Sequence, residues 1–324
     1  MDAMSHKRRH PHRAAGPRGR QATPATHGPA PTPRAAFGRR PWSLIGLASV
    51  VVGVTVLLIA IWFVLGQGGQ SGQTSWTRFG TADVHSLAFV DDDPQRLLFG
   101  HHHGLLETVD GGRSWRPLAT QADAMEIGAA GSGSIVIAGH NVFTASADGG
   151  ATWKDIPADL SSLDIHGFTR DPGDPARMWA YPTSGGFWES RDGGSHWQQV
   201  YADNILFPVA TTQNGQTVLY GLHVSGLASS SDGGRTWMPL TTPPASPFAS
   251  FIATPDGSVL LVGGLDGLFR SDDGGHLWAK LLFDGSAFAI GVTSDGRDIA
   301  VVTKETAFFR SRDGGQTWPG PATR

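Results

Sequence analysis

The sequence predicts an all-β protein, a single six-bladed β-propeller preceded by one N-terminal transmembrane helix. Three observations predict this fold. A short motif recurs six times at a spacing near 40 residues, short apolar segments fill the intervals, and an uncharged apolar run of 23 residues precedes the first copy. Repeats of this length with four short strands each are typical of propeller blades.

Residues 1–42 are predicted to be a disordered, basic, cytoplasmic tail. The first 40 residues hold nine Lys or Arg and one acid, Asp2, and they are rich in Pro, His and Ala without a hydrophobic period. The remainder holds 16 basic and 27 acidic residues, a net charge of −11. We therefore expect no nucleic-acid partner for the folded part.

Residues 43–65, SLIGLASVVVGVTVLLIAIWFVL, carry no charge and are long enough to span a bilayer. The run is longer than the apolar part of a signal peptide, and no A-x-A site follows it. The basic flank should remain cytoplasmic, so the sequence predicts a single-pass protein of the cell membrane with its C-terminal part extracytoplasmic. Residues 66–73, GQGGQSGQ, are a flexible linker to the propeller at 74–324. The chain has no cysteine, which excludes disulfides and thiolate metal sites.

The recurring motif is TVDGGRSW, SADGGATW, SRDGGSHW, SSDGGRTW, SDDGGHLW and SRDGGQTW. Its aspartates, separated by 38, 44, 40, 41 and 40 residues, are Asp110, Asp148, Asp192, Asp232, Asp273 and Asp313. Each copy stands between the third and fourth apolar segments of its unit. In the first unit, the three segments before the motif are residues 84–90, 96–99 and 105–109. The carboxylate can accept backbone N–H groups, the glycines allow positive φ, and the Trp can pack on the next unit. Six symmetric copies indicate a structural turn rather than a catalytic residue.

The pattern S-x-D-x-G-x-T-W resembles the Asp-box, or BNR, repeat over residues 74–318. Proteins with this repeat include sialidases, xyloglucan-type glycoside hydrolases, the sortilin (Vps10) ectodomain and photosystem II assembly factors. The chain is also similar to bacterial membrane-anchored propellers described as glycosyl hydrolase-like. This resemblance implies the propeller fold but gives almost no information about activity, because proteins of one fold can have many functions.

The ring should close through its N-terminal end. After Trp318 comes PGPATR, which is a poor strand because proline cannot donate to a ladder. The segment TSWTRF imitates the exit of a motif copy, so residues 75–79 should supply the outer strand of the last blade.

A second motif, an Asp followed two residues later by a His or Met, stands at the start of the first three units. Asp83 and His85 align with Asp164 and His166, while Asp123 and Met125 take these places in the second unit. Residues i and i+2 of a strand share a face. In a four-stranded meander, the first strand begins at the same end as the turn between strands two and three. The expected group at the channel mouth is therefore Asp83, His85, His102, His103, Asp123, Met125, His140, Asp164 and His166.

This group has three readings that the sequence leaves open. Imidazoles, carboxylates and a thioether favour a transition metal, Cu or Zn, with the thioether favouring copper. A polar pocket for a protein or glycan is the second. In the third, each Asp-x-His only satisfies backbone N–H groups at a strand start.

The function predicted is a binding or assembly module, with glycoside hydrolysis by paired carboxylates at the same face as the alternative. Sialidase activity is disfavoured, because the F-R-I-P motif is absent and the chain has three tyrosines. Xyloglucan-type enzymes have two propellers that form a cleft, whereas this sequence predicts a single propeller. Asp83, Asp123, Glu126 and Asp164 could still supply an acid pair of the separation that inverting hydrolases need.

Overall fold

The computed structural model of the chain describes residues 75–321 apart from 82, 131–132, 242–244 and 246. The predicted tail, transmembrane helix and linker at 1–73 lie outside these residues. Within the described part, no helix is sufficiently long and apolar to cross a membrane.

The described residues form six four-stranded antiparallel sheets, as the six motif copies predict. Blade 1 contains β2 (Ser86–Phe89), β3 (Leu97–His101), β4 (Gly104–Thr108) and β5 (Arg116–Pro117). Blade 2 contains β6 (Glu126–Ala130), β7 (Ser134–Gly139), β8 (Val142–Ser146) and β9 (Lys154–Asp155). Blade 3 contains β10 (Ile165–Arg170), β11 (Met178–Pro182), β12 (Phe187–Ser190) and β13 (Trp197–Tyr201).

The other three blades repeat the pattern. Blade 4 contains β14 (Leu206–Gln213), β15 (Gln216–His223), β16 (Gly226–Ser230) and β17 (Met238–Pro239). Blade 5 contains β18 (Phe248–Ala253), β19 (Leu260–Gly264), β20 (Gly267–Ser271) and β21 (Ala279–Lys280). Blade 6 contains β22 (Ala289–Val292), β23 (Ile299–Val302), β24 (Ala307–Ser311) and β1 (Thr77–Arg78).

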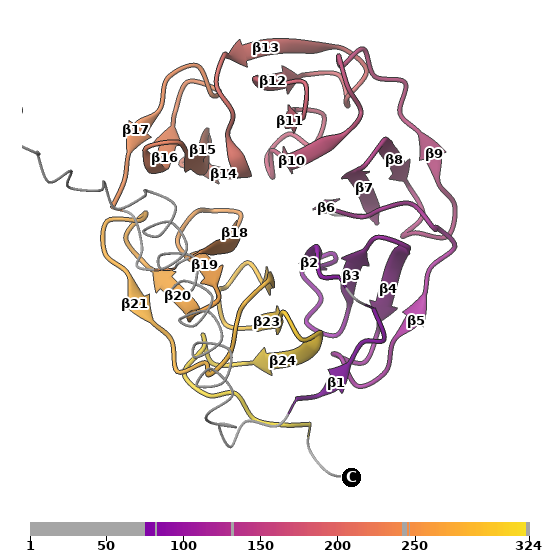
Figure 1. The fold of residues 1–324 in the computed structure, drawn as a ribbon, viewed down its shortest axis with the longest axis vertical. Coiled ribbons are helices and arrows are strands. Elements are labelled where there is room, and N and C mark those ends of the chain that lie inside the picture. Colours follow the sequence, from indigo (N-terminus) through magenta and orange to yellow (C-terminus); the bar gives the residue numbers. More distant parts are fainter. Residues whose placement is uncertain (1–74, 82, 131–132, 242–244, 246, 322–324) are drawn as a thin grey trace, which may run out of the picture. The chain divides into compact units, whose positions relative to one another are not determined.

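The first strand of each blade is innermost, and these strands form a closed ring (Figure 1). β2 contacts β6, and the contacts continue through β10, β14, β18 and β22 back to β2. Each sheet then runs outward to its fourth strand. The residues at the start of each inner strand are thereby brought around one axis.

The ring closes through β1, which pairs with β24 and confirms the predicted closure by residues 75–79. The Trp76 N–H donates to the Phe308 carbonyl at 2.8 Å, and the Phe79 N–H donates to the Thr306 carbonyl at 2.9 Å. The Trp76 indole also donates to the Pro319 carbonyl at 2.8 Å. Residues more than 220 positions apart in sequence thus hold blade 6 together.

The six motif copies form near-identical turns between the third and fourth strands, here called the DGG turns. In blade 4, Asp232 Oδ1 accepts the backbone N–H groups of Arg235 and Thr236 at 2.9 and 3.0 Å. The glycines Gly233 and Gly234 have φ of 78° and 88°, values that favour glycine. The Ser230 hydroxyl, two residues before the Asp, donates to Asp232 and accepts the Gly234 N–H. Ser or Thr stands at that place in all six copies, and a hydroxyl that ties the turn is what the sequence predicts.

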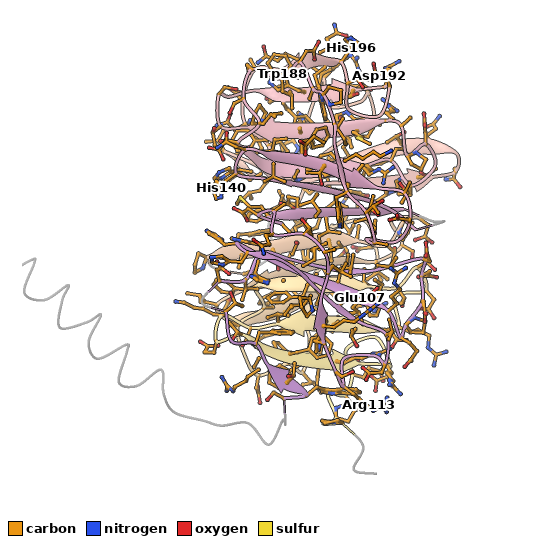
Figure 2. The ribbon with its side chains drawn as sticks, turned by 90° about the vertical axis from the view of Figure 1, so that its right-hand side faces the viewer. Glu107, Arg113, His140, Trp188, Asp192 and His196 are labelled. Carbon is orange, nitrogen blue, oxygen red and sulfur yellow. The ribbon has the colours of Figure 1, made fainter. Side chains whose placement is uncertain are left out.

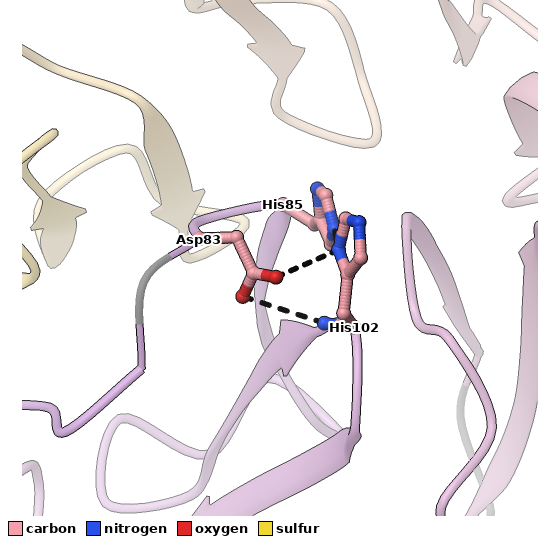
Figure 3. Close-up of side chains that lie close together, drawn as sticks. All are labelled: Asp83, His85 and His102. Atoms are coloured by element: carbon pink, nitrogen blue, oxygen red, sulfur yellow. Dashed lines mark hydrogen bonds and ion pairs between the residues drawn. The ribbon is translucent and has the colours of Figure 1, made fainter.

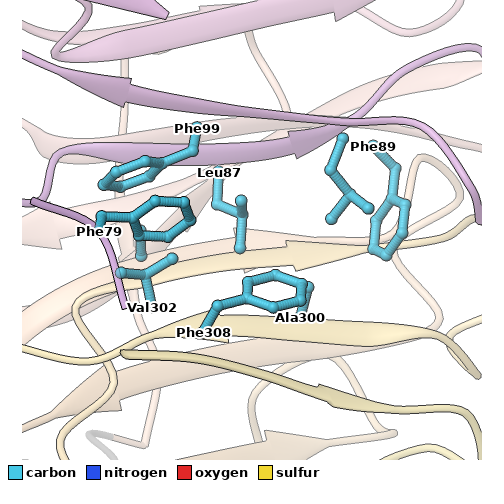
Figure 4. Close-up of a cluster of buried hydrophobic side chains, with 9 residues drawn as sticks. Phe79, Leu87, Phe89, Phe99, Ala300, Val302 and Phe308 are labelled. Atoms are coloured by element: carbon cyan, nitrogen blue, oxygen red, sulfur yellow. The ribbon is translucent and has the colours of Figure 1, made fainter. Parts of the chain in front are cut away.

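The core lies between neighbouring blades. At the seam of blades 1 and 6, nine buried side chains pack together: Phe79, Leu87, Phe89, Leu97, Phe99, Ala289, Ala300, Val302 and Phe308 (Figure 4). The rings of Phe79 and Phe99 stack at 4.3 Å between centroids. Trp115, the last residue of the first DGG turn, lies edge-on to Phe308 of blade 6 at 5.3 Å. The tryptophans therefore pack on the neighbouring blade, as the sequence predicts.

The DGG turns and the turns between second and third strands lie at opposite ends of the sheets. β4 begins after the turn that holds His102 and ends at the DGG turn of Asp110, and the other blades repeat this order. Figure 2 shows His140 at the left-hand edge of the propeller, with Asp192 and His196 of a DGG turn toward the right. One face thus consists of repeated turns, and the other is free to differ from blade to blade.

Candidate functional site

A continuous row of imidazoles and carboxylates crosses blades 1, 2 and 3 on the face opposite the DGG turns. Its members precede the inner strands, lie at the start of β10, or occupy the turns between the second and third strands. We call this set the His/Asp row: Asp83, His85, His102, Asp123, His140, Asp164 and His166.

The row begins in blade 1, where Asp83 holds His102 (Figure 3). Asp83 Oδ2 lies 2.7 Å from His102 Nδ1, and Asp83 Oδ1 accepts the His102 backbone N–H at 3.4 Å. The Thr81 hydroxyl donates to Asp83 Oδ1 at 2.6 Å. The His85 ring stacks on His102 with 4.4 Å between centroids, and His85 Nε2 contacts His102 Nδ1.

Asp123 of blade 2 joins the two halves of the row. Its Oδ2 lies 2.5 Å from His140 Nδ1. Its Oδ1 faces blade 1, at 3.6 Å from His85 Nε2 and 4.0 Å from His102 Nδ1. Oδ1 is buried and has no hydrogen-bond partner among the described residues.

The row ends in blade 3 with two imidazoles around one carboxylate oxygen. Asp164 Oδ1 lies 3.1 Å from His166 Nε2 and 3.9 Å from His140 Nε2. The Thr183 hydroxyl donates to the other oxygen, Asp164 Oδ2, at 3.0 Å. The side chains of His140, Asp164 and His166 are 40%, 32% and 35% exposed, so solvent reaches this end of the row.

The environment favours the protonation states that metal ligands need. Burial lowers the pKa of His85, and this effect outweighs the attraction of Asp123. For Asp83, partial burial acts to raise the pKa, but hydrogen bonds from Thr81 and His102 outweigh it and lower the pKa. A neutral imidazole and an ionised carboxylate are thus expected side by side at neutral pH.

Three overlapping groups of the row each bring three ligand atoms within 4.8 Å of one another: Asp83, His85 and His102; His102, Asp123 and His140; and His140, Asp164 and His166. Imidazole nitrogen and carboxylate oxygen are donors that suit Zn²⁺ and Cu²⁺. Ligands about 2.1 Å from a tetrahedral ion stand about 3.4 Å apart. In the third group, the two separations from Asp164 Oδ1, 3.1 and 3.9 Å, lie on either side of this value.

The structure does not bring two of the nine predicted residues into these groups. The His103 ring lies beside that of His101, with 6.1 Å between centroids, and the His103 backbone N–H donates to His101 Nδ1 at 3.2 Å. Met125 immediately precedes β6 and is half-buried. In blade 4, Asp203 and His223 form a separate pair at 3.9 Å, and the Tyr201 hydroxyl lies 3.3 Å from His223.

Two supporting residues were not predicted. Thr81 and Thr183 each bond a carboxylate of the row, and both have a signal in the sequence. Thr81 stands two residues before Asp83, a spacing at which Ser and Thr hydroxyls reach nearby polar groups. Thr183 occupies the turn of blade 3 that corresponds to the turns of His102 and His140.

Comparisons with known proteins concern the fold. No protein-family model matches the sequence, and no curated protein matches it. A solved structure of YCF48 bound to a D1 peptide is 20% identical, with a TM-score of 0.49, over 77% of this chain and 84% of that chain. YCF48 from Cyanidioschyzon merolae is 19% identical, with a TM-score of 0.48, over 76% of this chain and 87% of that one.

The chain is also similar to larger enzymes. The GH74 xyloglucanase from Xanthomonas campestris is 13% identical with a TM-score of 0.50, and the match covers 75% of this chain and 54% of the enzyme. The GH74 enzyme of Niastella koreensis is 16% identical with a TM-score of 0.50, over 73% of this chain and 46% of the enzyme. At these identities the likeness concerns the fold alone, and activity has to be argued from the site. The described residues form a six-bladed β-propeller, and the likeness to these GH74 enzymes is one of fold.

Proposed function

We propose that the chain is a membrane-anchored, extracytoplasmic binding module whose His/Asp row binds a divalent transition metal ion, Zn²⁺ or Cu²⁺. The anchor is the apolar run 43–65, and the basic tail before it favours a cytoplasmic N-terminus. The metal site faces away from the DGG turns, which leaves those turns to hold the blades.

The observation that carries the proposal is the arrangement of His140, Asp164 and His166. His140 Nε2 and His166 Nε2 stand 3.9 and 3.1 Å from the same oxygen, Asp164 Oδ1. An ion about 2.1 Å from each atom fits this spacing with only small side-chain movement. Three protein ligands leave a fourth position open, and the partial exposure of all three side chains gives that position access to solvent.

A second set of bonds supports these ligands. Asp123 Oδ2 lies 2.5 Å from His140 Nδ1, which fixes the ring so that Nε2 faces Asp164. Thr183 holds Asp164 through Oδ2 and leaves Oδ1 for the ion. Carboxylate–histidine–metal chains of this kind orient metal ligands and raise their basicity. The third reading of the sequence, that the Asp-x-His pairs only satisfy backbone N–H groups, does not account for the histidine–carboxylate contacts.

An exchangeable fourth position gives the module a means of binding a partner. A side chain, a glycan hydroxyl or water could complete the coordination of the ion. The partner protein or glycan would then meet the face that carries the row.

Glycoside hydrolysis is the second candidate, and one observation favours it. Burial raises the pKa of Glu126, the first residue of β6, to about 8. A carboxyl that stays protonated at neutral pH is what a general acid requires. The row carboxylates, in contrast, are each in contact with an imidazole. Hydrolysis would be supported if a polysaccharide is cleaved by the wild type and not by Glu126→Gln.

The metal proposal is tested by calorimetric titration of Zn²⁺ and Cu²⁺ into the full-length chain in detergent after chelator treatment. We expect His166→Ala to weaken binding by more than about 10- to 100-fold, the loss typical of removing only a supporting residue. His223→Ala is the control, because His223, at the end of β15, lies at the same end of its blade as the row but pairs with Asp203 outside it. Equal affinity of the wild type and His166→Ala would refute the proposal.

A further inference from the structure

We infer that the His/Asp row holds two cations rather than one, and that Asp123 couples them. This inference rests on the proposed metal-binding function. The first cation lies among His140, Asp164 and His166. The second lies in blade 1, among Asp83, His85 and His102, with Asp123 as its fourth ligand.

The buried oxygen Asp123 Oδ1 is the independent observation. It has no hydrogen-bond partner among the described residues, and the Asp123 side chain is only 11% exposed. A buried carboxylate oxygen without a partner is unfavourable, because it has lost its water without a replacement. The neighbours that face it are His85 Nε2 at 3.6 Å and His102 Nδ1 at 4.0 Å, both of them metal-ligand atoms.

A cation among these atoms would have four ligands, two imidazoles and two carboxylates. The 3.6 and 4.0 Å separations from Asp123 Oδ1 are near the tetrahedral value of about 3.4 Å. His102 stands closer to its other neighbours, at 2.7 Å from Asp83 Oδ2 and in contact with His85 Nε2. Its side chain is 45% exposed, so it has room to move outward when an ion enters. Asp83 is held in place by Thr81.

The two cations share one carboxylate through different oxygens. Asp123 Oδ1 faces the blade 1 site, while Oδ2 bonds His140 Nδ1, and His140 Nε2 faces the blade 3 site. Asp123 is thus a ligand of one ion and a positioning residue for the other. The row supplies three carboxylates against two divalent charges, which limits the repulsion between the ions.

The competing arrangement is one cation in the middle group of His102, Asp123 and His140. There, His140 Nδ1 is already bonded to Asp123 Oδ2 at 2.5 Å. Using the central site would break the bond that orients His140. The two outer sites keep it.

The test is the zinc content of the full-length chain after dialysis against Zn²⁺, measured by mass spectrometry of the metal. We expect two ions per chain in the wild type and in the His223→Ala control. His85→Ala should retain one ion, in blade 3, and His166→Ala should retain one, in blade 1. Asp123→Asn should lose the blade 1 ion and bind the other about 10- to 100-fold more weakly.

The outcomes separate this inference from the function on which it rests. A wild-type content of one ion that His85→Ala retains would overturn the second site and leave the metal-binding function standing. One ion lost in both His102→Ala and His140→Ala, but retained in His85→Ala, would place it in the central group. No bound zinc in the wild type would overturn both. Since the wild-type content alone decides between two, one and none, a variant that fails to fold does not obstruct the test.

Discussion

Replacing the aspartate of a DGG turn should destabilise the propeller without affecting metal binding. Asp232→Ala in blade 4 removes a carboxylate that accepts four hydrogen bonds. Their donors are the backbone N–H groups of Arg235 and Thr236 at 2.9 and 3.0 Å, and the hydroxyls of Thr236 and Ser230 at 2.6 and 2.8 Å. The turn lies at the opposite end of its blade from the face of the His/Asp row.

The magnitude follows from the exposure of this turn. A hydrogen bond to a charged group contributes about 1.5–3 kcal/mol when its partner would otherwise be left buried. Asp232 is exposed, so water replaces much of what the carboxylate provides. Loss of a comparable side-chain cap at a helix start costs about 0.5–2 kcal/mol. We therefore expect a loss of about 1–2 kcal/mol, which lowers the Tm of a domain of this size by about 2–8 °C.

The assay is thermal unfolding followed by tryptophan fluorescence, with zinc titration of the same sample. Asp203→Ala is the control, because the Asp203 side chain is 67% exposed and its ion pair with His223 is 3.9 Å long. An exposed ion pair of this kind contributes about 0–1 kcal/mol. The reasoning would be refuted if Asp232→Ala left the Tm unchanged, or if it abolished zinc binding at a temperature where the protein is folded.

Three further results are expected. First, hydrogen bonds from Thr152 lower the pKa of Asp148 to about 2, so the stability that this carboxylate contributes is complete above its ordinary pKa of 3.8. That stability should fall as the pH drops from about 4 toward 2, and acid titration of Asp148→Asn should show a smaller fall. Second, Phe79→Ala, at the seam of blades 1 and 6, should cost about 3–5 kcal/mol in chemical unfolding, whereas Leu277→Ala, with a side chain 75% exposed, should cost about 0.5 kcal/mol or less. Equal losses would exclude a stabilising role for the closure. Third, the Glu189 carboxylate is 3% exposed and bonds the Arg177 guanidinium at 2.8 Å, so Glu189→Gln should cost about 3 kcal/mol by the same measurement. A neutral effect would mean that water already screens this ion pair.

The propeller could be predicted from the sequence because each blade is marked by local chemistry. A turn with two consecutive positive φ values, as at Gly233 and Gly234, favours glycine at both positions, and a pair of glycines can be recognised directly in the sequence. The spacing of the turns then fixes the number of blades. The closing strand could be predicted for the same reason, since the residues around Trp76 repeat the exit of a DGG turn.

The row could be predicted only as a neighbourhood. The i, i+2 rule and the hairpin order place the seven residues at one end of blades 1–3. These rules do not give the χ angles that decide which imidazole nitrogen faces which oxygen. His103 illustrates the limit, because adjacent residues of a tight turn point in different directions and the His103 ring lies beside that of His101 rather than in the row. The unpartnered Oδ1 of Asp123 depends on the spacing between two blades, which the sequence does not encode locally.

Buried charges in the outer strands were not predicted at all. Glu189 lies in β12, immediately before a DGG turn, in a segment that the pattern marks as apolar. It is buried because Arg177 and Arg235 reach it from neighbouring segments, one of them in the next blade. A pair of this kind appears in the sequence as two ordinary surface charges.

The most direct measurement is anomalous X-ray scattering at the zinc edge from crystals of the Zn²⁺-loaded chain. We predict a zinc peak about 2.0–2.1 Å from the Nε2 atoms of His140 and His166, and none at the DGG turns. Zinc bound only at His196 or His276, which belong to those turns, would contradict this prediction.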